Sequence, residues 1–167
     1  IEQVQGRYDK ALGYAAEATT IVREIGERAG GVVLSTNVGM IHDDQGSYGA
    51  AIRSLNEAVE GARAIDNKHL LASALLYLGG TLAHLGHLAE AEKKLGEVER
   101  LVRETRNEAL VPELLNYQAD VQARRGEVGR CLKALGEALR RVEALGDRRV
   151  IIQTRLSLGR WSLAGPR

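Results

Sequence analysis

The chain has 167 residues, of which 44% are hydrophobic and 27% charged, a composition that is typical of a folded globular protein and argues against disorder. Phenylalanine is absent, proline occurs only twice, and alanine, leucine, glutamate and arginine dominate, so residue preferences favour helix throughout and predict an all-α fold. The net charge is +1, but residues 121–167 carry eleven Lys and Arg against four Asp and Glu, which leaves the first 120 residues at −6.

The spacing of leucine and alanine predicts eight helices. In chain order they cover residues 7–25, 31–44, 47–65, 68–85, 87–105, 109–125, 127–145 and 148–164. The pair 30-GG-31 is interpreted as a helix–helix turn, and the Asp or Asn of 66-DN-67, 106-RN-107 and 146-GD-147 can cap the helix that follows. Pro112 falls in the first turns of its helix, which we expect to start late or to bend there.

The chain repeats itself with a period of 40 residues, which is marked by Gly6, Gly46, Gly86 and Gly126. Each glycine is followed two positions later by an apolar residue. Each is followed five positions later by a small one, and these small residues are Ala11, Ala51, Ala91 and Cys131. A further small residue stands seven positions before each later glycine, at Gly39, Gly79 and Ala119, and Gly159 continues that series.

This spacing resembles the tetratricopeptide repeat, in which Leu-Gly, a Tyr or Leu, and then two small residues flanking a bulky one recur. The best match is 75-LLYLGGTLAHLGHLAEAEKKLGEV-98. The resemblance implies a right-handed superhelical solenoid of antiparallel helix pairs, forming a single array over residues 1–167. The usual period is 34, and 40-residue versions are similar to those of kinesin light chains, spindle-orienting adaptors and bacterial signalling regulators. A helical repeat of the HEAT type is the structural alternative, but it does not explain the twelve-residue spacing between small residues.

Three glycines inside 78-LGGTLAHLGHLAEAEKKL-95 require an explanation, because each costs about 1 kcal/mol in a helix interior. We expect Gly79 to allow the two helices of its repeat to approach closely, opposite Ala91 and Leu95. Gly86 is expected to end the first helix in a left-handed conformation. Gly80 either lines the concave surface and leaves room for a ligand or is merely tolerated, and we favour the second reading.

The last predicted helix is too apolar to face water along its whole surface. Its apolar residues are Ile151, Leu156, Leu158, Trp161 and Leu163. We therefore expect a homodimer or crystal contact to cover it here, and a further helix to cover it in a longer parent protein.

The resemblance also implies which side chains face a partner, because the first helix of each pair lines the concave groove of such arrays. Carried onto this sequence, these positions are Thr36, Asn37, Met40, Asp44, Ser73, Leu76, Tyr77, His84, Glu113, Asn116, Tyr117, Asp120, Arg124, Gln153 and Arg160. Asn37 resembles the asparagine that related arrays use to hold a peptide backbone, but Tyr77, Tyr117 and Ser157 replace it in the other repeats.

No catalytic or metal-binding pattern emerges from the remaining polar residues. His84 and His87 are three residues apart, but Gly86 separates them and no third ligand is fixed by spacing, so we interpret them as polar turn residues. Asp43 and Asp44 are adjacent and are interpreted as a solvated helix end rather than an acid–base pair. Cys131 occupies a position that is normally alanine and is expected to pack as a small buried residue. We expect neither enzymatic activity nor a cofactor.

Composition also bears on partners and compartment. The arginines near the end lack an aromatic platform or a nucleic-acid motif, so a solvated helical surface is expected rather than a nucleic-acid site. No run of 18 apolar residues exists and the first residues are polar, so neither a membrane span nor a signal peptide is expected, and the single cysteine fits the cytoplasm. The chain starts without Met and is expected to be part of a longer protein.

Two functions are consistent with these features. The first is a protein-interaction scaffold whose groove binds a peptide or a partner helix on preformed helices. The second is a regulatory or sensor segment of a larger bacterial signalling protein, such as a kinase or transcription activator, whose groove receives a small effector or its own catalytic domain.

Overall fold

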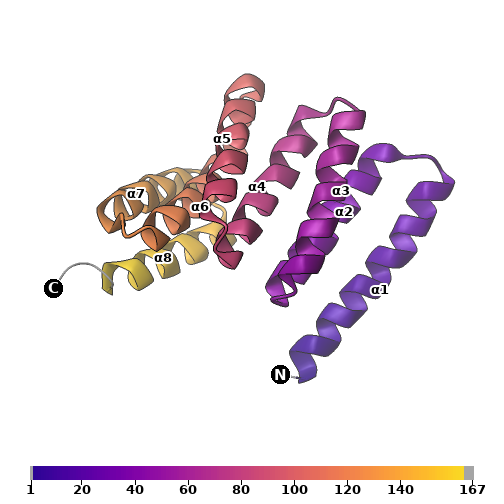
Figure 1. Cartoon of the computed structure of the whole chain (residues 1–167), viewed down its shortest axis with the longest axis horizontal. Coiled ribbons are helices and arrows are strands. Elements are labelled where there is room, and N and C mark those ends of the chain that lie inside the picture. The colour runs from indigo at the N-terminus through magenta and orange to yellow at the C-terminus, as the bar shows by residue number, and fades with distance from the viewer. Residues whose placement is uncertain (1, 164–167) are drawn as a thin grey trace.

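The structure is a computed structural model that describes the backbone of residues 2–163 and the side chains of residues 6–144, 146–148 and 150–163. Within that range the chain forms eight α-helices and one turn of 3-10 helix, η1, and no strands. The helices are α1 (Glu2–Glu24), α2 (Arg28–Asp44), α3 (Tyr48–Ala64), α4 (Lys68–Leu85), α5 (Leu88–Thr105), α6 (Val111–Arg124), α7 (Val128–Leu145) and α8 (Arg148–Leu163), and η1 is Glu108–Leu110. Figure 1 shows them stacked in chain order as a solenoid, which confirms the predicted fold class.

The helices form antiparallel pairs in which a first helix (α2, α4, α6) packs on the helix that follows it (α3, α5, α7). We call α2, α4, α6 and α8 the first-type helices and α1, α3, α5 and α7 the second-type helices. First-type helices also contact the next first-type helix along the stack, so α2 touches α4, α4 touches α6, and α6 touches α8. Side chains on these helices can therefore meet across repeats.

Turn geometry explains most of the predicted helix ends. Gly46, Gly86 and Gly126 have φ angles of +74°, +90° and +84°, as expected for the left-handed residue that ends a first-type helix. Gly6 does not share this role, because α1 begins at Glu2 and runs through Gly6. The predicted start at residue 7 is therefore wrong, since the chain makes no reversal there that would need a left-handed residue.

A second series of left-handed residues ends the second-type helices. Its members are also 40 residues apart, at Gly26, Asp66, Arg106 and Gly146. Asn67 then caps α4 by accepting hydrogen bonds from two backbone N–H groups of its first turn, at 3.1 and 3.0 Å. Asp147 accepts one from Val150 N–H at 3.2 Å, whereas the side chain of Asn107 makes no capping hydrogen bond. Two of the three predicted caps are thus present.

The pair Gly30 and Gly31 was predicted to form a turn but lies inside the first turn of α2. The reversal occurs earlier, at Gly26, and Glu27 caps the helix by accepting hydrogen bonds from the N–H groups of Ala29 and Gly30. The prediction failed because a glutamate can cap a helix in the same way as the shorter Asp, whereas two glycines are a weak stop signal on their own.

The start of the sixth helix matches the prediction made from Pro112. One turn of 3-10 helix, η1, precedes α6, which begins at Val111 with Pro112 in its first turn. A proline is tolerated there because the N–H it lacks would have no partner within the helix.

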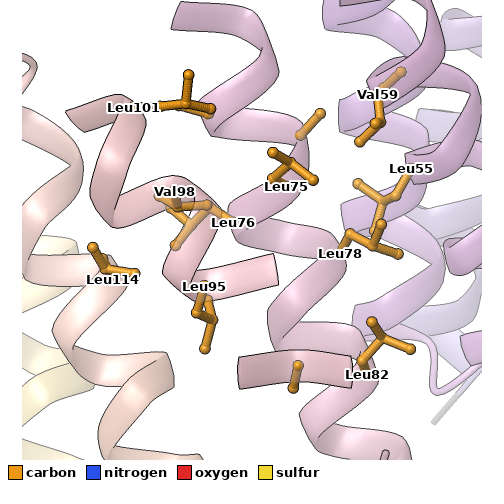
Figure 2. Close-up of a cluster of buried hydrophobic side chains, with 14 of the residues drawn as sticks. Leu55, Val59, Leu75, Leu76, Leu78, Leu82, Leu95, Val98, Leu101 and Leu114 are labelled. Atoms are coloured by element: carbon orange, nitrogen blue, oxygen red, sulfur yellow. The ribbon is translucent and has the colours of Figure 1, made fainter. Parts of the chain in front are cut away.

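The main core lies between the helices of each pair and between neighbouring repeats. Leu55, Leu75, Leu78, Leu95 and Val98 are at most 1% exposed in this core, which Figure 2 shows at the contact of α3, α4 and α5. Burying such side chains contributes about 1.5–3 kcal/mol each and is the main force that holds the repeats together.

The predicted close approach at Gly79 is confirmed. A Cβ atom at Gly79 would lie 2.8 Å from Cδ2 of Leu95 and 3.5 Å from the carbonyl oxygen of Ala91, so no side chain fits there. Gly39 stands in the same relation to Leu55, with a Cβ only 2.5 Å from Leu55 Cγ. The small residue of the first helix therefore receives the leucine of the second helix, and this packing compensates the poor helix propensity of glycine.

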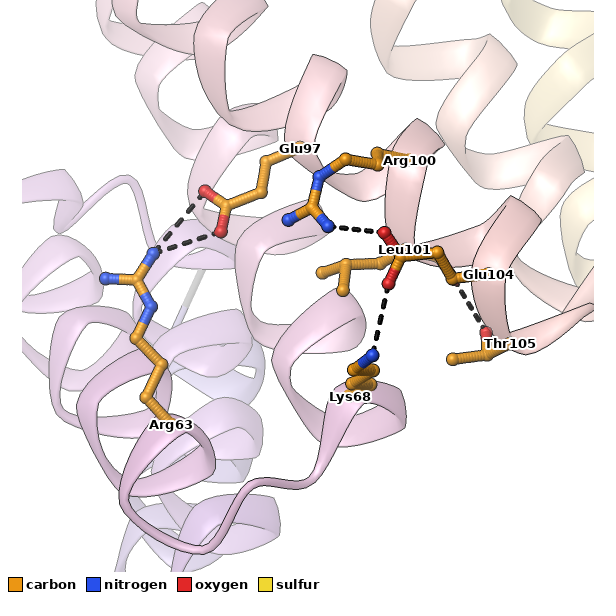
Figure 3. A network of polar contacts seen from close by, with 7 residues as sticks. All are labelled: Arg63, Lys68, Glu97, Arg100, Leu101, Glu104 and Thr105. Carbon is orange, nitrogen blue, oxygen red and sulfur yellow. Dashed lines mark hydrogen bonds and ion pairs between the residues drawn. The ribbon is translucent and has the colours of Figure 1, made fainter.

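Ion pairs cover the outer surface of α3, α4 and α5. Arg63 of α3 donates to Glu97 of α5 at 3.1 Å, and Lys68 of α4 donates to Glu104 of α5 at 3.2 Å, as Figure 3 shows. Their side chains are in contact with solvent, which screens the charges, so the pairs contribute little to stability.

Apolar side chains remain exposed at both ends of the stack. On α8, Ile152, Leu156 and Leu163 are 61%, 69% and 88% exposed. Leu158 and Trp161, which were grouped with them in the prediction, instead pack against the cluster that contains Cys131 and Leu135, and Ile151 is half-buried. On α1, exposed apolar side chains are found at Tyr14 and Ile21, and Ile25, directly after the helix, is exposed as well.

Candidate functional site

The first-type helices share one polar pocket of about 220 Å³. Side chains from all four of these helices line it: Met40, Asp43, Asp44, Tyr77, Thr81, Tyr117 and Gln153. We call this the polar pocket. Met40 and Gln153 are far apart in the sequence, so the curvature of the stack brings α2 and α8 to the same cavity.

Five of the residues predicted to face a partner line the polar pocket. These are Met40, Asp44, Tyr77, Tyr117 and Gln153. Asp43 and Thr81 were not predicted, although Thr81 stands one helical turn after Tyr77 and this spacing could have indicated it. Asp43 was interpreted as part of a solvated helix end, but its side chain is only 17% exposed, because His84 of the next repeat covers it.

Gly80 is explained by Tyr117, which corrects the interpretation that this glycine is merely tolerated. A Cβ atom at Gly80 would lie 2.3 Å from Cε1 and 2.6 Å from Cζ of the Tyr117 ring. The ring of the next repeat therefore rests directly on the backbone of α4. Burial, together with the nearby Glu113 carboxylate, raises the pKa of the Tyr117 phenol well above its ordinary value, so this side chain stays neutral.

His84 joins three repeats at the edge of the polar pocket. Its Nδ1 lies 3.0 and 3.2 Å from the two carboxylate oxygens of Asp43, and its ring lies between those of Tyr48 and Tyr117, with centroid distances of 6.1 and 6.3 Å. The hydrogen bond with Asp43 raises the pKa of His84 above its ordinary value of 6.5. Burial opposes this shift, the charges of Asp43 and Asp120 support it, and Arg124 opposes it.

Two further polar contacts flank the polar pocket. The hydroxyl of Tyr77 donates to Oε2 of Glu113 at 3.3 Å, and Glu113 is only 7% exposed. Arg124 donates to Asp120 at 2.6 Å within α6. Both pairs consist of residues predicted to face a partner, but of the four only Tyr77 lines the polar pocket.

The other predicted residues lie outside the polar pocket. Leu76 is fully buried in the core, and Asn116 is 6% exposed, with its Nδ2 donating to Thr154 Oγ1 at 2.8 Å between α6 and α8. The predictions that these two side chains face the groove are therefore wrong. The hydroxyls of Thr36 and Ser73 donate back to carbonyl oxygens of their own helices, while Asn37 and Arg160 are exposed.

A second hollow of about 450 Å³ lies among α1, α2 and α3. Its walls include Val22, Val32, Gly31 and Gly61, with Arg23, Glu27, Arg28 and Glu57 among the charged members. None of the residues predicted to face a partner contributes to it. The first-type helices therefore provide the candidate site that both the sequence and the geometry indicate.

Metal and nucleophile chemistry are not supported by the described side chains. His87 lies 3.5 Å from Glu90 and does not share a partner with His84. Within the part of the chain that the structure describes, no three His, Cys, Asp or Glu residues form a group that could hold a metal ion. Cys131 is fully buried, and burial raises the pKa of its thiol to about 11, so it remains protonated and packs as a small residue.

The stacked helix pairs define a helical-repeat protein, and comparison with known families identifies the class. Residues 1–64 match the family model described as tetratricopeptide repeat, and residues 64–125 match the model described as anaphase-promoting complex subunit 5. These matches support membership of the tetratricopeptide repeat family. No curated protein matches it.

Family membership carries general expectations. Tetratricopeptide repeats generally mediate protein–protein interaction, and members of the family are typically non-enzymatic scaffolds. Within residues 2–163, none of the helices combines the length and the apolar character that crossing a membrane requires.

Proposed function

We propose that this chain is a protein-interaction scaffold that binds a peptide or partner segment along the groove formed by α2, α4, α6 and α8. The observation that supports this most is the polar pocket, because all four first-type helices contribute a side chain to it. A ligand that enters it would contact three to four repeats at once. A partner segment that lies along the groove makes contacts of this kind.

The rigidity of the lining supports the same proposal. Tyr117 is fixed on Gly80, and Tyr77 is fixed by its hydrogen bond to Glu113, so neither ring has to be ordered when a partner binds. Binding to preformed side chains avoids an entropic cost of about 0.5–1.5 kcal/mol for each one that would otherwise be immobilised.

The size of the polar pocket favours a partner segment over a small effector. Sites for drug-sized ligands enclose about 300–1,000 Å³, whereas the polar pocket encloses about 220 Å³. It suits one side chain of a longer partner, with the rest of that partner lying along the helices. This reasoning ranks the sensor function of a larger signalling protein second.

The proposal also covers the extent of the array, its compartment and its oligomeric state. We propose that residues 1–167 act as one repeat array in the cytoplasm and that the exposed apolar stripe of α8 allows a homodimer. That stripe consists of Ile152, Leu156 and Leu163.

A capture experiment with two matched variants tests the proposed groove. Gln153→Trp would fill the polar pocket from a half-buried position, whereas Arg103→Trp places the same side chain on the exposed surface of α5. Proteins bound by the purified chain from its source-cell lysate should be retained by Arg103→Trp and lost by Gln153→Trp. Equal retention by two variants that melt like the wild type would contradict groove binding.

A further inference from the structure

The hollow among α1, α2 and α3 is large enough to hold a whole small molecule. It encloses about 450 Å³, and sites for drug-sized ligands enclose about 300–1,000 Å³. Most of its lining surface is apolar, and we call it the apolar hollow. Among the side chains that the structure describes, it shares no lining residue with the polar pocket.

The charged side chains around the apolar hollow balance one another and are in contact with solvent. They are two arginines and two glutamates, namely Arg23, Arg28, Glu27 and Glu57, and all four are exposed. The carboxylate of Glu27 also caps α2. The described lining therefore offers a charged ligand no excess of either sign, and its main contribution to binding is apolar surface that a ligand can remove from water.

The 40-residue period shows which side chains are missing from the apolar hollow. Three small residues line it at positions where the next repeat has leucines. Gly31, Ser35 and Gly61 stand one period before Leu71, Leu75 and Leu101. Leu75 and Leu101 belong to the main core, and Leu71 packs against it. The space that is open in the first repeat is therefore filled by aliphatic side chains in the second.

A larger residue elsewhere in the lining compensates only part of this loss. Val32 replaces Ala72 of the next repeat, and a Cβ atom at Gly61 would lie 2.9 Å from its Cγ2. Val32 thus occupies the place that a side chain at Gly61 would need. At Gly31, by contrast, the nearest atom that a Cβ would meet is Cγ1 of Val22, at an ordinary contact distance of 3.9 Å. The open space therefore lies beside Gly31.

We propose that the apolar hollow binds a small uncharged aliphatic molecule. The hydrocarbon part of this molecule takes the space that leucine side chains fill in the next repeat. It lies against Val22 and Ile65, which are only half-buried, and against Val32. The site lies outside the groove of the first-type helices, so the ligand is additional to any partner that the groove holds.

The proposal is tested by nuclear magnetic resonance titration with two probes of equal length, 1-hexanol and 1,6-hexanediol. 1-Hexanol should produce saturable shifts of the methyl signals of Val22, Val32 and Ile65. The diol should bind at least about fivefold more weakly, because its second hydroxyl loses hydrogen bonds with water in an apolar site. Equal affinity of the two probes, or no saturable shift with 1-hexanol, would overturn the proposal.

Two variants that fill the apolar hollow sharpen the titration. Gly31→Leu and Ser35→Leu each restore a leucine that the next repeat has, and each should abolish saturable binding of 1-hexanol. Gly31→Leu should melt at or above the wild-type temperature, because filling a cavity and replacing a helical glycine both stabilise a fold. Gly96→Leu is the matched control on the exposed surface of α5 and should bind 1-hexanol as the wild type does.

The other outcomes of this comparison contradict the proposal. Unchanged binding of 1-hexanol by folded Gly31→Leu and Ser35→Leu variants would place the probe elsewhere on the molecule. Melting temperatures lowered by both substitutions would show that the space beside Gly31 is not open. Neither result bears on groove binding, which the capture experiment with Gln153→Trp tests at different residues.

Discussion

The two faces of α4 differ at a pair of adjacent glycines. Gly79 faces the second helix of its own repeat, where Leu95 fills the space that a side chain would need. Gly80 faces the groove, where the ring of Tyr117 from the next repeat occupies that space. Both glycines are close-packed, but the first contact recurs in the array and the second does not.

The difference between these two contacts distinguishes positions that stabilise the fold from positions that form the candidate site. One period before Gly79 stands Gly39, which packs on Leu55 in the same way, whereas the positions equivalent to Gly80 are Met40, Asp120 and Arg160. A repeated residue supports a contact that every helix pair needs. A residue that changes from repeat to repeat is free to serve a ligand, and Met40, Asp43, Asp44, Thr81 and Gln153 of the polar pocket are of this kind.

Substitution of Gly79 should produce the largest loss of stability. Gly79→Leu would place four carbon atoms where even a Cβ lies 2.8 Å from Leu95, which is itself 1% exposed. We expect a loss of about 3 kcal/mol in the free energy of unfolding, the upper end of the range for overpacking. Urea denaturation measures it, and an unchanged midpoint would show that the α4–α5 register is wrong.

Substitution of Gly80 should cause a smaller loss of stability, and the size of this loss should depend on whether Tyr117 is present. Gly80→Ala should cost about 1–2 kcal/mol because its Cβ would overlap the ring of Tyr117. In the Tyr117→Ala background the same substitution should instead stabilise the chain by about 0.5–1 kcal/mol, through helix propensity alone. Additive effects in this double-mutant cycle would contradict the packing of the ring on α4.

A glycine without neighbours provides the matched control. Gly96 lies in the middle of α5, is exposed, and has nothing within 4 Å of the position that a Cβ atom would occupy. Gly96→Ala should raise the free energy of unfolding by about 0.5–1 kcal/mol. The same urea denaturation series measures it. A lower free energy of unfolding for Gly96→Ala would show that helix propensity does not decide the effect of a glycine in this array.

The smallest expected effect is the pH dependence of the His84–Asp43 pair. The pKa of His84 is raised in the folded state, so the pair stabilises the fold fully below the ordinary value of 6.5 and less as the pH rises through the folded-state pKa. His84→Gln should therefore be less stable than the wild type at about pH 5.5, and the difference should shrink by about pH 8.5. Melting curves of the two proteins at both pH values check this. A stability difference that grows with pH would contradict the raised pKa of His84.

The fold could be predicted from the sequence because its determinants recur every 40 residues. Self-alignment identified the turn glycines at 46, 86 and 126 and the contact between Gly79 and Leu95, both of which the structure contains. It started the first helix at residue 7, directly after Gly6, in error, because α1 begins at Glu2 and runs through that glycine.

The site was only partly predictable because its contacts join different repeats and occur once. Asp43 and His84 are 41 residues apart, and Gly80 meets a tyrosine of the following repeat. Neither contact has a counterpart elsewhere in the array that alignment could have detected. Asn116 was placed in the groove because its helix lines it, but its side chain turns toward Thr154 of α8.

The most direct test of groove binding is site-specific photo-crosslinking at two positions of the same chain. A photoreactive amino acid replaces Gln153 at the polar pocket in one protein and Arg103 on the exposed surface of α5 in the other. The account predicts that a captured partner crosslinks at position 153 and not at position 103. Crosslinks confined to position 103 would show that the chain binds through its second-type helices and would contradict the account.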